Sequence, residues 1–126
     1  MKNNPKTSFE KSIKIKQKIL KHNLTDVIIQ MAATISKRIE SGNKLLLCGN
    51  GGSAGDAQHL AAELIVRLRS QKNRKALPAI TLALDTSTLT ACANDFGFDR
   101  IFERTLESIG LENDILLVIR TSGNSK

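Results

Sequence analysis

Large aromatic residues are scarce in this sequence, and long hydrophobic segments are missing. Tryptophan and tyrosine are absent and only four phenylalanines occur, so leucine, isoleucine and alanine must fill the core. No apolar run approaches the roughly 20 residues of a membrane-spanning helix, which argues against a membrane protein. Residues 1–6 are polar and no apolar segment follows them, which argues against a secretory signal.

Cysteine is equally scarce. Cys48 and Cys92 are the only two, and both stand in apolar stretches without the spacing of metal ligands. We expect reduced thiols in the core of a cytoplasmic protein rather than a disulfide. The 126 residues, of which 40% are hydrophobic, are enough for one small packed domain.

The positive charge of the sequence is concentrated at its start. The net charge is +7, and residues 1–22 contribute +6 of it through seven lysines and one glutamate. A basic arm of this kind can bind nucleic acid. Because Phe9 is the only aromatic residue in the arm that could stack on a base, a solvated helix face is the favoured interpretation. Nucleic acid is therefore not expected as a partner.

An apolar run followed by a glycine-rich segment is the most informative part of the sequence. Four apolar residues, Leu45–Cys48, suit a strand buried on both faces of a parallel sheet. Gly49, Gly51 and Gly52 then allow a sharp turn that brings backbone N–H groups close to a ligand. Ser53 can cap the next helix, whose amino end is a natural anion site. The segment predicts a strand, a phosphate-binding turn and a helix.

Several kinds of phosphate loop share this form. Residues 49–54 fit the loose dinucleotide pattern G-x-G-x-x-A, but residues 67–72, about 20 positions later, lack the acidic residue of that fingerprint. A Walker loop requires lysine after its last glycine, whereas Asp56 follows Gly55. A sugar-phosphate site remains, and the alternative is a tight turn without a ligand. Three glycines at one strand end favour a ligand, because glycine is costly to order.

Hydrophobic periodicity predicts alternating helices and strands along the rest of the chain. After a frayed start at residues 1–7, two amphipathic helices are expected, the second ending at Gly42. Asp85 and Asp99 are expected to cap later helices. The expected elements are helices from residue 8 and from residue 24, a strand over 44–48, a helix over 54–69, a strand over 79–84, a helix over 86–93, a turn over 94–97, a helix over 99–109 and a strand over 115–119.

This alternation predicts an α/β fold with a parallel sheet and right-handed crossovers. The loops at the carboxyl ends of such strands converge on one crevice, and three of them carry polar residues: 50–53, 94–95 and 121–125. The last resembles a helix start, and three strands would leave one face of the sheet poorly covered. We therefore expect residues 1–41 to form N-terminal helices and residues 42–126 to form the front part of a larger domain.

His59 and Glu63 stand four residues apart on the helix that follows the glycine-rich turn. That spacing places an imidazole and a carboxylate on one face, one turn apart. The pair could share a metal ion, or act as a base and its orienting partner. From the spacing alone an ordinary helical ion pair is the favoured interpretation, because two ligands do not complete a metal site.

Four motifs, in this order, resemble the sugar isomerase (SIS) domain family and, within it, the phosphoheptose isomerases. They are residues 48–54 (CGNGGSA), 56–64 (DAQHLAAEL), 94–98 (NDFGF) and 121–125 (TSGNS). The resemblance implies a doubly wound α/β fold, usually a homotetramer with sites at subunit interfaces. It implies an aldose–ketose isomerase of heptose biosynthesis, which converts sedoheptulose 7-phosphate to D-glycero-D-manno-heptose 7-phosphate through an enediol.

The resemblance also implies which residues form the site. Glu63 would be the base that takes a proton beside the carbonyl, and Asp95 is the second residue expected to act in catalysis. Zinc would be held in part by His59 and Glu63. The residues expected to bind the sugar phosphate are Asn50, Gly51, Gly52, Ser53, Glu63, Asn94, Asp95, Arg120, Thr121, Ser122 and Ser125.

Two departures from the family pattern accompany this resemblance. Arg120 stands where the family usually has serine or threonine, and it could add a phosphate contact or crowd the pocket. The family's other zinc ligands, a glutamine and a histidine that is also the general acid, belong to a C-terminal stretch beyond residue 126. A chain ending at residue 126 is therefore expected to be inactive.

A non-catalytic SIS protein that binds a sugar phosphate or a replication initiator is the alternative function. One such relative lacks the glutamate at the position of Glu63, so the presence of Glu63 favours the isomerase.

Overall fold

The computed structural model describes residues 4–82 and 85–121 and divides into two compact units, Met1–Ser36 and Lys37–Lys126. The first unit contains helix α1 (Pro5–Lys21) and most of helix α2 (Leu24–Glu40), with Asn23 between them in a left-handed conformation (φ 53°). Helix α2 begins as predicted and ends just before Gly42, whose φ of 90° places it in the conformation typical of a helix end.

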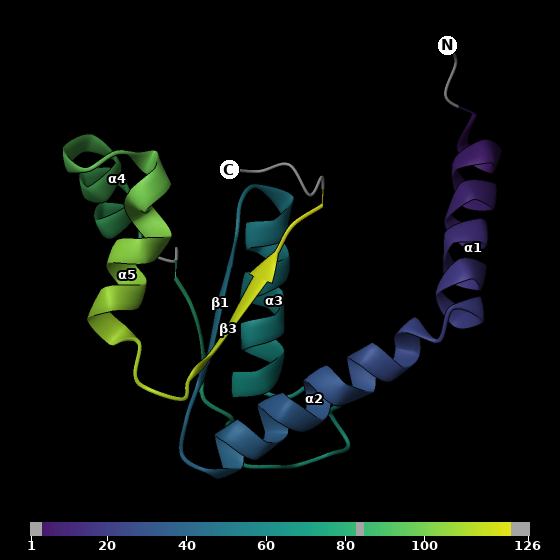
Figure 1. Ribbon diagram of the computed structural model, residues 1–126, viewed down its shortest axis with the longest axis horizontal. Coiled ribbons are helices and arrows are strands. Elements are labelled where there is room, and N and C mark those ends of the chain that lie inside the picture. The colour runs from purple at the N-terminus through teal and green to yellow at the C-terminus, as the bar shows by residue number, and fades with distance from the viewer. Residues whose placement is uncertain (1–3, 83–84, 122–126) are drawn as a thin grey trace. The chain divides into compact units, whose positions relative to one another are not determined.

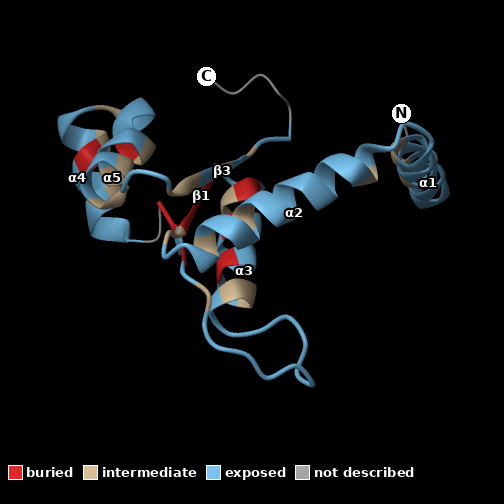
Figure 2. Cartoon of the chain, turned by 60° about the horizontal axis from the view of Figure 1, so that its bottom comes forward, coloured by how far each residue is buried: buried red, intermediate tan, exposed pale blue. Residues whose placement is uncertain are grey.

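Helix α1 starts earlier than the sequence predicted. Asn4 is its cap, because the Asn4 side-chain oxygen accepts a hydrogen bond of 3.0 Å from the Lys6 backbone N–H. Pro5 fits the first turn, where its missing N–H has no partner to lose. The predicted fraying is therefore wrong for residues 4–7. Neither α1 nor α2 buries a residue among those described, and Figure 2 shows both almost entirely in the colour of exposed residues.

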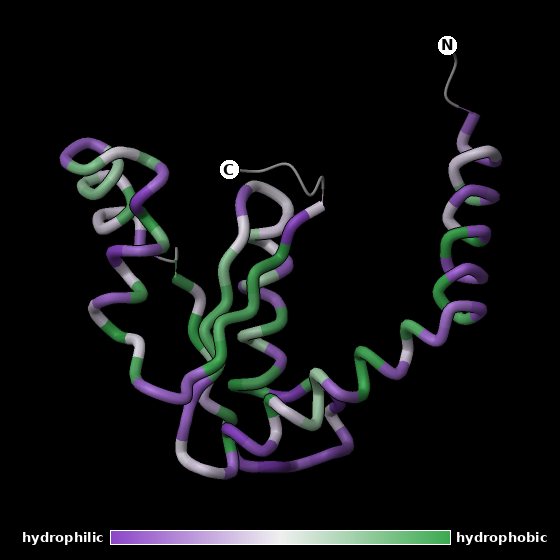
Figure 3. Tube along the Cα trace, in the orientation of Figure 1, coloured by the Kyte–Doolittle hydropathy of each residue, from purple (hydrophilic) through white to green (hydrophobic). Residues whose placement is uncertain are grey.

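The second unit is built on a parallel three-stranded sheet with the order β2-β1-β3. Figure 1 labels β1 and its neighbour β3. The strands of the sheet are β1 (Leu45–Gly49), β2 (Ala79–Thr81) and β3 (Ile115–Ile119). Leu45 pairs with Ala79 on one side and with Ile115 on the other, so β1 is the central strand. All five of its residues are buried, which confirms the apolar run as a strand covered on both faces. Figure 3 shows β1 and β3 as a continuous hydrophobic centre.

Helices lie on both faces of this sheet, as in a doubly wound fold. Helix α3 (Gly52–Ile65) packs on the sheet through its small buried residues Ala57 and Ala61. On the other face, Leu46, Cys48 and Leu82 pack against helix α5. The α5 side chains at this contact are Phe102, Leu106 and Ile109. The remaining helices of this unit are α4 (Thr86–Asp95), the 3-10 turn η1 (Phe98–Arg100) and α5 itself (Ile101–Ile109).

The boundaries of α3 differ from the prediction at both ends. The helix begins at Gly52 because Gly51, at a φ of 57°, forms its cap, and Ser53 lies inside the first turn with no side-chain capping bond. The prediction that Ser53 caps this helix is therefore wrong. The helix ends at Ile65 rather than near residue 69, because Val66 (φ −91°, ψ −85°) leaves the helical conformation.

The boundaries of the other elements differ from the predicted ones by smaller amounts. Strand β1 is shifted by one residue toward Gly49, and β2 ends at Thr81, with residues 83–84 outside the described part. Helix α4 continues through Asp95, beyond the predicted end at residue 93. Asp85 caps α4 as predicted, since it accepts hydrogen bonds from the backbone N–H groups of Ser87 and Thr88. These bonds and the Thr88 hydroxyl lower the pKa of Asp85, the hydroxyl most strongly.

The predicted cap of α5 is wrong. Asp99 lies within η1, and Arg100 occupies the cap position of α5 without a side-chain capping bond. Strand β3 and the preceding turn agree with the prediction. Both cysteines are free and buried, as expected, and burial raises the pKa of the Cys48 thiol.

An ion pair fastens the amino ends of β1 and β3. The Lys44 ammonium lies 2.6 Å from Oδ2 of Asp114, whose side chain is only 5% exposed. Asp114 also accepts hydrogen bonds from the backbone N–H groups of Lys44 (2.9 Å) and Leu111 (2.8 Å). Burial alone would raise the pKa of Asp114, but these hydrogen bonds and the lysine charge together lower it to about 2. The carboxyl ends of the strands lie at the opposite edge of the sheet from this ion pair.

Candidate functional site

A cavity of about 230 Å³ lies where β1 and β3 end. The turn after β1 contributes Gly49, Asn50 and Ser53, and the end of β3 contributes Arg120 and Thr121. The other lining residues are Phe102, Val118 and Ile119. Two of the three polar loops predicted to converge therefore meet at one cavity, which is where parallel α/β sheets bind ligands.

The electrostatics of this cavity suit an anion. Helix α3 starts at its rim with no acidic residue in the first turn and no side-chain cap, so the positive end of the helix dipole stays uncompensated by side chains there. Arg120 adds a cation to the wall. Ser53 is buried and its hydroxyl is positioned by the first turn of α3. Gly51 and Gly52 are exposed in the same turn and do not line the cavity.

The turn after β1 is tightly packed around Gly49. A β-carbon at Gly49 would meet the Ser53 carbonyl oxygen at 2.7 Å, a distance that real β-carbons do not tolerate. The Ser53 N–H in turn donates to the Asn50 carbonyl at 3.1 Å. Only glycine at position 49 permits the first turn of α3 to approach the end of β1 so closely.

His59 and Glu63 lie together on α3, as their spacing predicted. His59 Nε2 is 3.6 Å from Glu63 Oε1. The imidazole is mostly exposed, with 73% of its side-chain surface accessible, whereas Glu63 is 26% exposed. The second carboxylate oxygen, Oε2, is fully buried, and no hydrogen-bond partner for it exists among the described residues. An ion pair with His59 therefore accounts for one oxygen of Glu63 and leaves the other without a partner, which is unusual for a buried charge-bearing atom.

Asn94 and Asp95 occupy the last turn of α4, where the Asn94 amide donates to Asp95 Oδ1 at 2.8 Å. Both are exposed, and neither lines the cavity at the ends of β1 and β3. The structure thus does not bring this third loop to the cavity. Ser122 and Ser125 lie outside the described residues. The lining residues Phe102, Val118 and Ile119 were not predicted as site residues. For Phe102 the available signal was its place in the predicted helix over residues 99–109.

No cluster of three or more His, Cys, Asp or Glu side chains that could hold a metal ion occurs within residues 4–82 and 85–121. Over the same described ranges, no helix is long and apolar enough to cross a membrane.

Comparison with known proteins gives one consistent result. Residues 8–126 match the family model of the SIS domain. The phosphoheptose isomerase of Chlorobaculum parvum is 55% identical over 114 residues, which are 90% of this chain and 54% of that protein. The phosphoheptose isomerase of Clostridium acetobutylicum is 46% identical over 127 residues, covering 100% of this chain and 64% of that protein.

Comparison of the structure with solved structures also finds phosphoheptose isomerases. The solved structure of a phosphoheptose isomerase from Neisseria gonorrhoeae matches with a TM-score of 0.84 and 41% identity, over 94% of this chain and 60% of that one. A phosphoheptose isomerase from Francisella tularensis matches with a TM-score of 0.74 and 36% identity, over 94% of this chain and 64% of that one. The chain spans about half the length of the curated relatives it matches first.

Proposed function

The chain belongs to the SIS domain family, and we propose that it supplies the phosphate-binding part and the catalytic base of a phosphoheptose isomerase. The reaction would interconvert sedoheptulose 7-phosphate and D-glycero-D-manno-heptose 7-phosphate. The observation that carries the proposal is the buried Oε2 of Glu63, which has no partner among the described residues and lies on the helix that starts at the cavity between the ends of β1 and β3. The names of the relatives at 46% to 55% identity support the choice of substrate.

The phosphate of the sugar would be held at the cavity between the turn after β1 and the end of β3. The positive amino end of α3, the Ser53 hydroxyl and the Arg120 guanidinium border this cavity and would interact with the phosphate there. Thr121 borders the same cavity. The family resemblance implies Ser122 and Ser125 as further hydroxyl donors to the phosphate. Asn50 would orient the sugar hydroxyls next to the phosphate.

Glu63 would act as the base. Its carboxylate takes the proton from C1 of the ketose, the electron pair of that C–H bond forms the C1–C2 double bond, and the C2 carbonyl oxygen gains a proton. The resulting enediol is then protonated at C2 while the C1 oxygen gives up its proton, which yields the aldose. His59, whose Nε2 lies 3.6 Å from Glu63 Oε1, would orient the carboxylate. Asp95 does not line the cavity in this chain, and its proposed role as a second catalytic group rests on the family resemblance.

Zinc is proposed as the metal of the complete site. An imidazole nitrogen and a carboxylate oxygen are both ligands that zinc prefers. The observation that fits a ligand there is Oε2 of Glu63, which has no partner within the described part of the chain. His59 and Glu63 would supply two of the protein ligands. Bound zinc would polarise the substrate carbonyl as a Lewis acid.

The similarity to phosphoheptose isomerases supports two further proposals, on location and on oligomeric state. We place the protein in the cytoplasm, as for a sugar-phosphate enzyme, and we propose a homotetramer. The support for an oligomer is that α1 and α2 expose large apolar side chains, among them Phe9 (72% exposed) and Ile29 (64% exposed), that a monomer would leave in water. A non-catalytic SIS protein remains the second candidate function, and the presence of Glu63 argues against it.

A hybrid protein tests the proposed function. In it, residues 1–126 replace the matching part of the Chlorobaculum parvum phosphoheptose isomerase, and conversion of sedoheptulose 7-phosphate is followed directly. Turnover by the hybrid is expected. A folded hybrid that binds the sugar phosphate without converting it would support the non-catalytic candidate instead.

A further inference from the structure

The loop between α3 and β2 is strongly basic, yet its arginines do not have equivalent surroundings. Arg67, Arg69, Lys72 and Arg74 line an open cavity of about 560 Å³ formed by the loop itself. Among the described residues, Arg74 is the only basic side chain of this loop with a hydrogen bond to α3. The positive charge of the loop therefore does not by itself explain why Arg74 contacts α3.

The guanidinium of Arg74 binds the carboxyl end of α3. One nitrogen donates to the Glu63 carbonyl oxygen at 2.6 Å, and the other donates to the carbonyl oxygens of Leu64 (2.8 Å) and Lys75 (2.9 Å). The last carbonyls of a helix have no partner within the helix, and here the helix stops abruptly at Val66. Helix α3 has no basic residue of its own in its last turn, so Arg74 supplies both the missing donors and the missing cation.

We propose that Arg74 is a positioning residue, which fixes the last turn of α3 and thereby the carboxylate of Glu63. This proposal rests on the proposed role of Glu63 as the base. The Arg74 guanidinium donates hydrogen bonds to the backbone carbonyl of Glu63 itself and to that of Leu64. A further bond holds the same turn, because the Leu77 N–H donates to the Leu64 carbonyl at 3.1 Å. A small displacement of a catalytic group is enough to slow a reaction greatly.

The phosphate cavity lies at the other end of the same helix. A helix of 14 residues is about 20 Å long, so loss of Arg74 should leave the phosphate donors at Gly49–Ser53 in place. The expected signature is therefore a fall in kcat with little change in KM. A loss of general stability would instead lower the active fraction and leave kcat per folded molecule unchanged.

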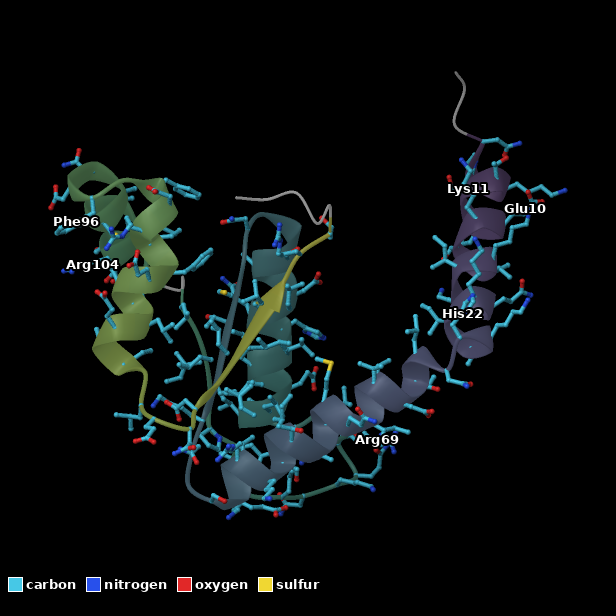
Figure 4. All side chains as sticks on the ribbon, in the orientation of Figure 1. Glu10, Lys11, His22, Arg69, Phe96 and Arg104 are labelled. Carbon is cyan, nitrogen blue, oxygen red and sulfur yellow. The ribbon has the colours of Figure 1, made fainter. Side chains whose placement is uncertain are left out.

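The test compares Arg74→Ala, Arg74→Lys and Arg69→Ala in the hybrid protein described above. Arg69, which Figure 4 labels, is the matched control, because it belongs to the same loop and its side chain makes no hydrogen bond or ion pair within the described part of the chain. We expect kcat per folded molecule to fall about 10- to 100-fold in Arg74→Ala, with KM within about twofold. Arg69→Ala should match the parent, and Arg74→Lys should recover part of the rate because lysine can reach one carbonyl.

A second readout does not depend on turnover. Amide hydrogen exchange at residues 62–66 should accelerate in Arg74→Ala and stay unchanged in Arg69→Ala. Guanidinium chloride at millimolar concentration should restore part of the rate of Arg74→Ala only. If Arg74→Ala does not fold, the kcat and exchange of Arg74→Lys decide the question.

The outcomes separate the two proposals. An active parent with equal kcat in the Arg74 and Arg69 variants would overturn the positioning role and leave the proposed function standing. A parent hybrid without turnover would overturn the proposed function, and the positioning role with it.

Discussion

Gly49 and Ser53 are so close that the first turn of α3 rests directly on the end of β1. A β-carbon at position 49 would lie 2.7 Å from the Ser53 carbonyl oxygen and 2.8 Å from the Ser53 β-carbon. By contrast, a β-carbon at Gly55, one turn further along the same helix, would meet nothing within 4 Å. Substitution by alanine is therefore expected to have opposite effects on stability at the two glycines.

We expect Gly49→Ala to destabilise the chain by about 1–3 kcal/mol, because backbone atoms must shift to admit the methyl group. It should also weaken sugar-phosphate binding, since the cavity wall moves with Ser53. Gly55→Ala should instead stabilise the protein by roughly 0.5–1 kcal/mol, as expected for alanine in a helix. Denaturant unfolding and calorimetric titration with sedoheptulose 7-phosphate measure both effects, and equal stabilities of the two variants would contradict the packing described here.

Glu63→Gln tests the base. The substitution keeps the size and helix propensity of the side chain but removes the basic oxygen, so kcat in the hybrid should fall about 10²–10⁴-fold while the fold is retained. Glu107→Gln is the matched control, because Glu107 forms only an exposed ion pair with Arg104, 3.6 Å away. A near-normal kcat in Glu63→Gln would show that Glu63 is not the base and serves only as the ion-pair partner of His59.

The ion pair of Lys44 and Asp114 predicts a specific dependence of stability on pH. The folded-state pKa of Asp114 is about 2, below its ordinary value of 3.8, so the carboxylate stabilises the fold fully above pH 4. That stabilisation should disappear as the pH falls from about 4 to about 2. Because the Lys44 side chain is 17% exposed and water partly screens its charge, we expect a contribution of only about 1–2 kcal/mol.

Unfolding by urea at pH 7 and at pH 2.5 measures this contribution. Asp114→Asn should be less stable than the parent at pH 7, and the difference should shrink at low pH. A matched control is Asp26→Asn, at a surface position in the first turn of α2. A difference between Asp114→Asn and the parent that is independent of pH would show that the charge of Asp114 is not the stabilising feature.

The two thiols should be protected in the folded chain. Cys48 is 5% exposed and Cys92 is 7% exposed, and burial raises the pKa of Cys48, so little thiolate forms at neutral pH. We expect both to react with a disulfide reagent at least roughly 100-fold more slowly than in denaturant, through opening of the fold. A Cys92→Ser variant assigns the remaining signal to Cys48. Immediate reaction of Cys48 would mean that the contact of β1 with α5 is open.

The sequence predicted the parts of the fold that depend on local patterns. A strand was predicted from the apolar run Leu45–Cys48, because a strand buried on both faces requires apolar residues. The binding turn was predicted from three glycines before a helix, because glycine favours left-handed turns. The helix ends were harder to predict. Leu68 lies within the helix predicted over residues 54–69, yet α3 stops three positions before it and Leu68 is 71% exposed.

Long-range contacts account for what the sequence could not predict about the site. Arg74 belongs to the segment between the elements predicted over residues 54–69 and 79–84, for which the sequence predicted no structure. Its bonds to the Glu63 and Leu64 carbonyls depend on how the chain returns from α3 to β2. Similarly, the contact of Arg104 with the Phe96 ring, 4.5 Å from its centroid, joins α5 to the segment after α4 (Figure 4). Neither pair is recognisable from spacing, because the two partners are not neighbours on one helix or strand.

The central position of β1 has a consequence for synthesis on the ribosome. This strand is made first, but its two partners, β2 and β3, emerge only after long crossovers, and no strand of the sheet can form a local hairpin because all pairs are parallel. Until Ile119 leaves the exit tunnel, at least one edge of β1, all of whose residues are buried in the finished fold, has no hydrogen-bonded neighbour. Nascent chains of this protein should therefore depend on chaperones for the interval in which β1 waits for β3.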